Sequence, residues 1–456
     1  MKKSFSRRDF VAGTGMVGMT AVLSGIFPEI LVASGVSENN GKPSILGGKA
    51  MNKGSYSQWP LLQGNEEKLL LEVLKSGQWF RGDSTLQMAE RFEQEFASMN
   101  GAKHCIAVNS GTSALVASLA ALDMGPGDEV ITSPYTFIAT INSIMSHYAL
   151  PVPADVDLES FQVDPTCAKN VCSKNTRCLM PVHIGGAPAD MDGFLALGKK
   201  LDVPVIEDAC QAHLGRWNNK NLGTLGTAGC FSMQVSKNLS CGEGGAILTD
   251  DDQLAEKIFQ CHNNCRGRQL DSFDFSYGSI RAVNQRMTEF QAAVLLAQMP
   301  GIEAYAQTRQ DNGMYLNTLL AEIPGVIPAK LYPGTTRNAW HLYMFRIDKE
   351  KFGLDRGTFI QALEAERIPC SPGYGAVDWI DFVRTIYDTR AASRIYPKKV
   401  LDDWAERVGN LPQFERLCSE AVWFTQNMLL GPRENMDVIA SAIRRIQTNA
   451  AEIAKK

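Results

Sequence analysis

The sequence predicts an α/β fold in which helices cover both faces of a large, mostly parallel sheet, with a second, smaller domain. Helical and extended segments alternate from residue 66 to residue 206, which is the rhythm of repeated βα units. The chain has 456 residues, too many for one ordinary core. Apolar residues make up 45% of it and charged residues 21%, as in a typical globular protein. The net charge of -4 favours neither a nucleic-acid-binding nor a polybasic membrane-binding surface.

The expected elements follow from local periodicity. Helices are expected where apolar residues recur at a helical period, and strands where short apolar runs meet turn residues. Ligands of such sheets bind at the carboxyl ends of the strands, so the residues at those ends carry the functional information. The expected helices cover 66–76, 84–99, 111–124, 136–148, 192–201, 303–319, 358–366 and 436–446, and the expected strands cover 103–108, 129–132, 178–182, 203–206 and 342–347.

The N-terminus resembles an export signal. Arg7 and Arg8 stand just before Phe10, and an apolar stretch rich in glycine and alanine follows to about Leu23. That stretch has the length of a signal h-region and is too short to span a bilayer comfortably. We therefore expect a twin-arginine signal segment over 1–34, a linker over 35–58 and export out of the cytoplasm, to the periplasm or a membrane-anchored location. A frayed amphipathic N-terminus is the alternative.

The eleven cysteines do not form a metal-binding or disulfide pattern. Cys261 and Cys265 flank a histidine, but a second pair of ligands is missing, so no metal site is expected. Cys167, Cys172 and Cys178 are close enough along the chain for a disulfide, yet their spacing does not demand one, and the question stays open.

Two strand ends carry residues suited to a phosphate and to a flat ring. Gly111, Thr112 and Ser113 follow the first expected strand, where a tight turn, free helix N–H groups and two hydroxyls would cradle a phosphate. Plain helix capping is the alternative. Phe137 follows the second strand and would cover one face of a heterocycle, although core packing explains it equally well.

A carboxylate ends another apolar strand. Asp208 follows the run from Pro204 to Ile206, and an unpaired carboxylate at such a place is costly. A protonated pyridine nitrogen would supply a cationic partner, and Gln211 would then reach the phenolic oxygen of the same ring. The alternative is an aspartate that caps the following helix.

A single lysine decides between these interpretations. Lys237 lies in a run of small and apolar residues before a glycine-rich segment, where desolvation lowers the pKa of an amine and makes it a nucleophile. A surface lysine is the alternative, and a P-loop is excluded because glycine and lysine stand in the wrong order. Together the strand ends predict a pyridoxal-phosphate (PLP) enzyme in which Lys237 holds the cofactor as a Schiff base.

In this order the four segments resemble the DegT/DnrJ/EryC1/StrS family of PLP aminotransferases. The similarity runs from about Trp59 to Ile446, and further matching segments are 183–192, 284–291 and 340–343. The resemblance implies the aspartate aminotransferase-like fold type I of PLP enzymes, with a large PLP-binding domain over 59–300 and a smaller C-terminal α+β domain over 301–456. Segments 368–374 and 421–431 resemble the inosamine and aminohydroxybenzoate synthase branch of the family.

The resemblance also implies a role for each site residue. Lys237 would bind the cofactor and shuttle the proton, and Asp208 would face the ring nitrogen. Asn284 would reach the phosphate of a second subunit, which implies a homodimer with a shared active site. The implied cofactor-binding residues are Gly111, Thr112, Ser113, Phe137, Asp208, Gln211, Ser232, Lys237 and Asn284, and the substrate-side candidates are His183, His341 and Tyr374.

The implied reaction moves an amino group from glutamate or glutamine to a keto-sugar or keto-cyclitol, with small molecules as partners and no nucleic acid. Gly185 and Met233 depart from aromatic residues common in the family and would reshape the substrate side. Sugar dehydratases of the same fold carry histidine in place of the lysine, so Lys237 disfavours that alternative. A non-catalytic PLP-binding regulatory protein is the third hypothesis, and the intact residue set argues against it. An export signal argues against a nucleotide-linked substrate.

Overall fold

The computed structural model describes residues 41–82, 84–267 and 281–456. These residues belong to one compact unit, Val36–Lys456. The expected signal segment 1–34 and the first six residues of the expected linker lie outside the described residues. Within the described ranges, no helix is long and apolar enough to cross a membrane.

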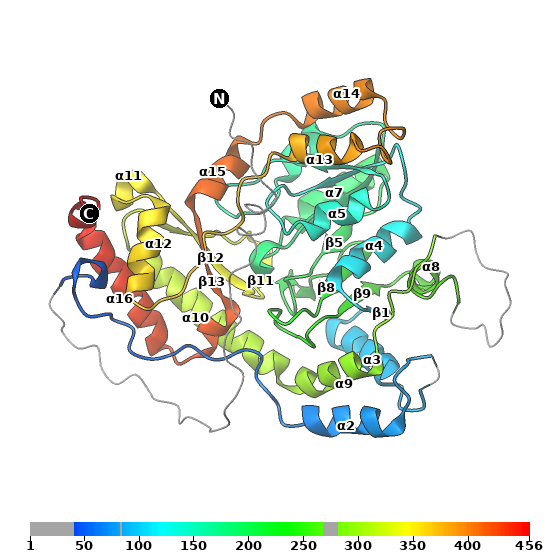
Figure 1. The fold of residues 1–456 in the computed structure, drawn as a ribbon, viewed down its shortest axis with the longest axis horizontal. Helices are drawn as coiled ribbons and strands as arrows, with labels where there is room; N and C mark the ends of the chain where they lie inside the picture. Colours follow the sequence, from blue (N-terminus) through cyan, green and yellow to red (C-terminus); the bar gives the residue numbers. More distant parts are fainter. Residues whose placement is uncertain (1–40, 83, 268–280) are drawn as a thin grey trace. The chain divides into compact units, whose positions relative to one another are not determined.

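A seven-stranded sheet forms the centre of the larger domain (Figure 1). Two hydrogen-bonded groups, β3-β2-β4 and β5-β8-β9-β1, are joined by parallel bridges between β4 and β5. All strands run parallel except β9, which is antiparallel to both of its neighbours, so the expected mostly parallel sheet is confirmed. The strands are β1 (His104–Val108), β2 (Glu129–Thr132), β3 (Leu150–Pro153), β4 (Thr176–Met180), β5 (Ile206–Asp208), β8 (Ala228–Ser232) and β9 (Gly245–Thr249).

Helices cover both faces of this sheet, and alternate residues of one strand serve the two resulting cores. Ala107 of β1 joins the core that contains Phe92 and Phe96, whereas its neighbour Ile106 joins the core that contains Leu115. Strands buried on both faces are continuously apolar, which explains the short apolar runs of the sequence. The helices of this domain are α2 (Glu66–Ser76), α3 (Met88–Asn100), α4 (Gly111–Ala121), α5 (Ala139–Met145), α6 (Pro165–Asn170), α7 (Met191–Leu201), α8 (Asp252–His262) and α9 (Glu289–Gln298).

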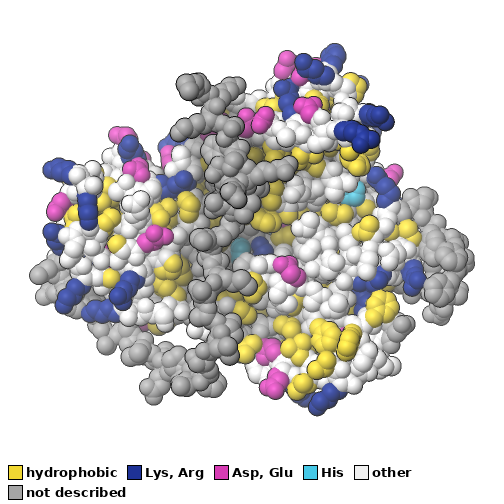
Figure 2. Space-filling view, in the orientation of Figure 1, with side chains coloured by type: hydrophobic (Ala, Val, Ile, Leu, Met, Phe, Trp, Pro, Cys, Tyr) yellow, Lys and Arg dark blue, Asp and Glu magenta, His cyan; other side chains and the backbone are white. Residues whose placement is uncertain are grey.

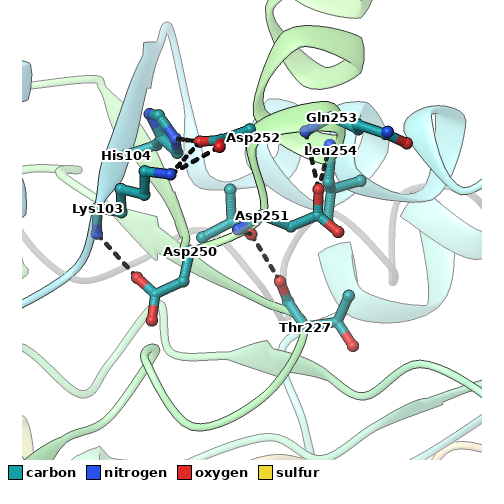
Figure 3. A network of polar contacts seen from close by, with 9 residues as sticks. Lys103, His104, Thr227, Asp250, Asp251, Asp252, Gln253 and Leu254 are labelled. Atoms are coloured by element: carbon teal, nitrogen blue, oxygen red, sulfur yellow. Dashed lines mark hydrogen bonds and ion pairs between the residues drawn. The ribbon is translucent and has the colours of Figure 1, made fainter.

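The start of α8 is attached to the start of β1 by a polar network at the surface (Figure 3). Asp251 caps the helix by accepting hydrogen bonds from the N–H groups of Gln253 and Leu254, at 2.8 and 3.0 Å. The side chains of Lys103 and His104 both reach Asp252, at 2.6 Å. These contacts attach the two elements to each other, and none of the groups is an expected site residue.

The smaller domain has its own antiparallel sheet and core. Its strands are ordered β10-β12-β13, and apolar residues of α10, α12 and α16 pack on them around Phe345. The expected α+β character of this part of the chain is therefore observed. Its elements are α10 (Ile302–Ala321), β10 (Val326–Pro328), β12 (Leu342–Ile347), α11 (Lys349–Phe352), α12 (Arg356–Ala365), β13 (Ala421–Thr425), α16 (Glu434–Thr448) and α17 (Ala450–Ile453). A third small sheet is ordered β11-β6-β7, with β6 (Arg216–Trp217), β7 (Lys220–Asn221) and β11 (Thr335–Arg337).

The expected domain 301–456 does not pack as one body. Helices α13 (Trp379–Tyr387), α14 (Lys398–Val408) and α15 (Pro412–Glu420) join the core of the large domain, where Figure 1 shows α13 and α14 in orange. Trp379 and Trp404 donate their indole N–H groups to the carbonyls of residues 134 and 151, at 3.1 and 3.0 Å. Sequence order alone cannot predict this return, because the partners lie about 250 residues away.

The expected linker 35–58 is corrected over its described part. Residues 43–58 form a docked segment that includes a short 3-10 helix, Ser44–Leu46. Ile45 and Met51 pack against the core of the smaller domain. The buried carboxylate of Glu366 accepts hydrogen bonds from the N–H groups of Ser44 and Met51, at 2.8 and 2.9 Å. The glycine- and serine-rich composition of this segment predicted a linker, because it contains only a few apolar residues that pack on the core.

Candidate active site

The carboxyl ends of three parallel strands bring the expected site residues together. Gly111 follows β1, Asp208 ends β5 and Ser232 ends β8. A Cβ atom added to Gly111 would lie 2.6 Å from Cβ of Ser232 and 3.0 Å from Sγ of Cys210. Only glycine fits here, and its absent side chain lets the start of α4 approach the end of β8.

The start of α4 has the form of an anion-binding site. Its capping residue is Ser110, whose Oγ accepts a hydrogen bond from the N–H of Ser113 at 3.0 Å. The N–H groups of Gly111 and Thr112 belong to the first turn, which has no intrahelical acceptor. The hydroxyl of Ser113 is used within the protein, because it donates to Oδ1 of Asn109 at 2.6 Å. Hydrogen-bond donors for an anion therefore come from the backbone of this turn and from the side chains of Thr112 and Ser232. The hydroxyl of Ser113 is a poorer candidate because it is already bonded.

Asp208 is a buried carboxylate held by neutral donors. Thr140 donates its hydroxyl to Oδ2 at 2.8 Å, and the N–H of Cys210 lies 3.2 Å from Oδ1. Thr136 is hydrogen-bonded in turn to Thr140, at 2.7 Å. A turn, and not a helix, follows β5, so helix capping does not explain this aspartate. Its charge lies in the sheet with no cationic side chain bonded to it among the described residues.

Lys237 lies in a turn after β8 and is half-buried. Its N–H donates to the carbonyl of Gln234 at 2.8 Å, and the N–H of Val235 donates to the carbonyl of Gly242 at 2.9 Å. Burial lowers the pKa of Lys237, while the nearby Cys210 and Asp208 act in the opposite direction. A lowered pKa leaves more of the amine neutral, and the neutral amine is the nucleophilic form.

Phe137 does not pack in the core. Its side chain is 59% exposed beyond the end of β2, whereas Tyr135, two residues earlier, is fully buried. The sequence left open whether Phe137 packs in the core or covers a heterocycle, and its exposure excludes packing in the core. An exposed aromatic ring at a strand end is available to cover a flat ligand.

Gln211 and Tyr374 are in direct contact. Nε2 of Gln211 donates to the phenolic oxygen of Tyr374 at 3.0 Å, and its Oε1 accepts the N–H of Gly185 at 2.8 Å. Burial raises the pKa of Tyr374 well above its ordinary value, so this phenol stays protonated. Gln211 therefore connects the strand that carries Asp208 to the C-terminal substrate-side candidate. In this arrangement its amide is already engaged by protein groups.

His183 has no free ring nitrogen for a substrate. It is fully buried; Nδ1 accepts the N–H of Ala189 at 3.1 Å, and Nε2 lies 3.0 Å from Oε2 of Glu207. Because Nδ1 is an acceptor, Nε2 carries the proton and donates to the carboxylate. Glu207 also accepts the N–H groups of Gly223, Leu225 and Gly226, at 2.7 to 2.8 Å. This pair, which sequence reasoning missed, anchors β5 and so fixes the position of the neighbouring Asp208.

His341 is buried near Lys237, and two basic residues that sequence reasoning missed accompany it. The positive charge of Lys237 contributes to lowering the pKa of both His213 and His341, after burial as the main cause. Arg309, from α10, acts on both histidines in the same direction. His213 could have been predicted from the sequence, because it stands two residues after the expected site residue Gln211. No sequence pattern marks Arg309 as a site residue.

Asn284 is exposed and pairs through its backbone with Asn263. Its Oδ1 atom accepts the N–H of Arg286 at 3.4 Å. A single chain does not bring Asn284 against a second active site, and its contact with the phosphate of another subunit stays a prediction.

The residues present fit PLP. The helix start suits its phosphate, the buried Asp208 lacks a cationic partner, Phe137 is exposed, and Lys237 has a lowered pKa. These groups come from four different strand ends, which is the arrangement that defines a ligand site in a doubly wound sheet.

These features define an α/β enzyme of the PLP-dependent fold type I class, and comparison with known proteins agrees. The chain belongs to the DegT/DnrJ/EryC1/StrS aminotransferase family, whose model matches residues 60–425. It is accordingly a PLP-dependent transaminase, and the expected fold is confirmed.

Two similar proteins have assigned activities. The chain is 32% identical over 402 residues to 3-amino-5-hydroxybenzoate synthase of Amycolatopsis mediterranei, covering 86% of this chain and 98% of the relative. It is also 32% identical over 431 residues to the L-glutamine:2-deoxy-scyllo-inosose aminotransferase of Streptoalloteichus tenebrarius, covering 91% and 98%. A crystal structure of 3-amino-5-hydroxybenzoic acid synthase superimposes with a TM-score of 0.76 at 31% identity, covering 90% of this chain and 100% of that one.

Proposed function

We propose that this protein transfers an amino group from glutamate or glutamine to a keto-cyclitol or keto-sugar, with PLP bound at the strand ends around Lys237. The observation that carries the proposal is the convergence of Lys237, Asp208 and the start of α4 on one edge of the sheet. Relatives that act on glutamine and 2-deoxy-scyllo-inosose support the cyclitol class of acceptor.

These residues divide the tasks of the proposed reaction among them. The N–H groups at Gly111 and Thr112 and the hydroxyl of Ser232 hold the phosphate, and Phe137 covers the ring. Asp208 holds the proton of the ring nitrogen, and this protonated ring is what supplies the electron-withdrawing chemistry. Lys237 carries the cofactor and then moves a proton to and from the substrate carbon through Nζ.

A donor and acceptor screen tests the proposal. The purified, PLP-loaded protein is given glutamate, glutamine or alanine, each with keto-cyclitols and keto-sugars, and the aminated product is measured by mass spectrometry. Glutamate or glutamine with a keto-cyclitol is expected to give the highest product yield. If the donors react but no acceptor of either class is aminated, the proposed acceptor class is wrong.

The homodimer is part of the same proposal. The exposed apolar side chains of α2 and the following turn include Leu71, Leu74, Trp79 and Phe80. The ring of Trp79 lies 5.7 Å from that of Phe290, six residues after Asn284. The ring of Phe80 lies 5.1 Å from the guanidinium of Arg286, and Figure 2 shows hydrophobic side chains gathered over this part of the surface. A patch of this kind supports contact with a second copy. Light scattering should give a molar mass twice that of one chain, and a monomeric mass with full activity would refute the shared site.

Export by the twin-arginine route is a separate proposal, supported by Arg7, Arg8 and the apolar stretch that follows. A reporter fused after residue 58 is expected to leave the cytoplasm. The Arg7→Lys plus Arg8→Lys double variant should keep the reporter inside, and Lys2→Arg plus Lys3→Arg serves as the control. Equal export of all three fusions would remove the proposal.

A further inference from the structure

Three basic side chains near Lys237 have unused hydrogen-bonding atoms. Arg309, His213 and His341 are almost fully buried, with 0%, 2% and 6% of their surface exposed. Nη1 of the arginine and Nδ1 of each histidine have no hydrogen-bond partner within the described part of the chain. Buried polar groups are nearly always bonded, because an unbonded one costs free energy. Three such atoms in one part of the interior therefore require an explanation.

Arg309 is connected to the turn of Lys237 through Trp59. The guanidinium carbon lies 5.2 Å from the centroid of the Trp59 ring, and Trp59 donates its indole N–H to the carbonyl of Val235 at 2.9 Å. Nε and Nη2 of Arg309 both donate to Oε1 of Gln426. The bonds to a neutral amide orient the guanidinium without neutralising it, and they leave Nη1 free.

The histidines reach the same turn from two other segments. Asn238, the residue after the lysine, donates from Nδ2 to the carbonyl of Ala339 at 2.7 Å, and His341 follows two residues later. Nε2 of His213 lies 3.3 Å from Sδ of Met233, which precedes the lysine by four residues. The segments that carry the three basic side chains therefore all meet residues 233–238 around Lys237, and Arg309 does so through Trp59.

The charge of this group is not balanced. Burial lowers the pKa of Arg309 to about 9, so at neutral pH it still carries its charge. Burial, aided by the positive charges of Lys237 and Arg309, lowers the pKa of His213 to about 3 and that of His341 well below its ordinary value. No described carboxylate acts on any of the three. An unpaired buried cation is expensive, and an anionic ligand would remove that cost.

We propose that Arg309, His213 and His341 form a carboxylate-binding subsite that holds the carboxylate of the amino donor beside Lys237. This inference rests on the proposed function and names the donor's binding site. A keto-cyclitol brings hydroxyls and no charge, whereas glutamate and glutamine each bring a carboxylate. A guanidinium and a carboxylate form strong charge-assisted hydrogen bonds, and the neutral imidazole of His341 adds an N–H donor at Nδ1. The proton of His213 lies on Nε2, which faces the acceptor Sδ of Met233, so this ring lines the subsite without donating to the carboxylate.

The test measures binding of glutarate, a dicarboxylate that has no amino group and cannot react, to the PLP-loaded protein by calorimetry. The wild type is expected to bind glutarate and not the uncharged glutaramide. Arg309→Gln retains a hydrogen-bonding amide beside Gln426 and should raise the Kd for glutarate roughly 10- to 100-fold, as expected for loss of a charge-assisted bond. His341→Asn should raise the Kd by a smaller factor. Arg444→Gln, which removes a half-exposed arginine paired with Glu322, is the matched control.

Kinetic constants show whether the subsite binds the amino donor, the keto acceptor or the phosphate of the cofactor. The KM for the amino donor should rise in Arg309→Gln together with the Kd for glutarate, while the KM for the keto acceptor and the affinity for PLP stay at wild-type values. A weaker affinity for PLP with unchanged glutarate binding would assign the subsite to the cofactor phosphate and overturn the proposal. A raised KM for the acceptor alone would overturn it as well.

Failure of the subsite and failure of the proposed function look different. If no tested donor reacts, yet glutarate binding depends on Arg309, the function fails and the subsite stands. If transfer proceeds normally and wild-type protein does not bind glutarate, the subsite alone fails. Should Arg309→Gln unfold, as judged by circular dichroism, the Kd of His341→Asn for glutarate decides: an unchanged value overturns the proposal.

Discussion

The Lys237→Ala variant is expected to lose aminotransfer, with kcat reduced by at least about 10²- to 10⁴-fold, the usual range for removing a general acid–base group. Lys237 lies in the turn after β8, where it is half-buried, and burial lowers its pKa. Burial thus favours the neutral amine, which is the form that both proposed tasks require. The product of glutamine and a keto-cyclitol, measured by mass spectrometry, gives the rate.

Chemical labelling supplies an independent measure for the same residue. Borohydride treatment of the yellow, PLP-loaded wild type should remove the colour and leave the cofactor attached to the peptide that contains Lys237. Lys257→Ala, which removes an exposed lysine of α8, is the control and should behave as the wild type. A label on any other lysine, or a Lys237→Ala variant with normal rate, would contradict the assignment.

The Asp208→Asn variant is expected to fold and to lose most of its activity, by roughly 10²- to 10³-fold, because one partner of a buried charge pair is removed. Asparagine has nearly the shape of aspartate, and its Oδ1 can still accept the N–H of Cys210. Thr140 is also bonded to Thr136, so its hydroxyl keeps a partner. What disappears is the charge that would face the ring nitrogen of PLP.

Two measurements separate this loss from general damage. The Kd for PLP should rise and the absorbance of the bound cofactor should shift in Asp208→Asn, while the thermal midpoint of the cofactor-free protein stays close to the wild type. Asp252→Asn, at the exposed start of α8, is the matched control with no change in rate or spectrum. Full activity in Asp208→Asn would mean that the carboxylate has no role in the chemistry.

The sequence predicted the elements best where periodicity was undisturbed. Expected segments 66–76, 129–132 and 342–347 coincide with α2, β2 and β12. The strand β3 was missed because Leu150–Pro153 contains two prolines, which an edge strand tolerates and a central strand does not. The helix expected over 136–148 is shorter, Ala139–Met145, because the polar and aromatic residues before it form the strand-end turn.

The site residues can also be divided into those predicted from local sequence patterns and those whose roles needed the structure. Gly111 and Asp208 were predicted from local patterns at strand ends, Lys237 from its run of small and apolar residues, and Ser232 from the family resemblance. The structure brings these segments to one edge of the sheet, because the carboxyl ends of parallel strands meet there. The roles left open for Phe137 and His183 needed exposure and hydrogen bonds, which no local pattern contains. The fold class and the aminotransferase family were thus predicted correctly from the sequence alone, and the role of Lys237 stays a prediction of that sequence.

Only the tertiary structure decided where the rest of the chain meets that lysine. Arg309, Trp59 and Val235 come together although they span more than 200 residues of sequence. Helices α13 and α14 pack in the core of the large domain although they follow strands of the smaller domain in the sequence. Helical or extended periodicity reports which face of an element is buried, but not which distant element buries it. That choice depends on packing and on the pairing of buried polar groups, and it is what brings Arg309, His213 and His341, each with one unpartnered nitrogen, to the segment around Lys237.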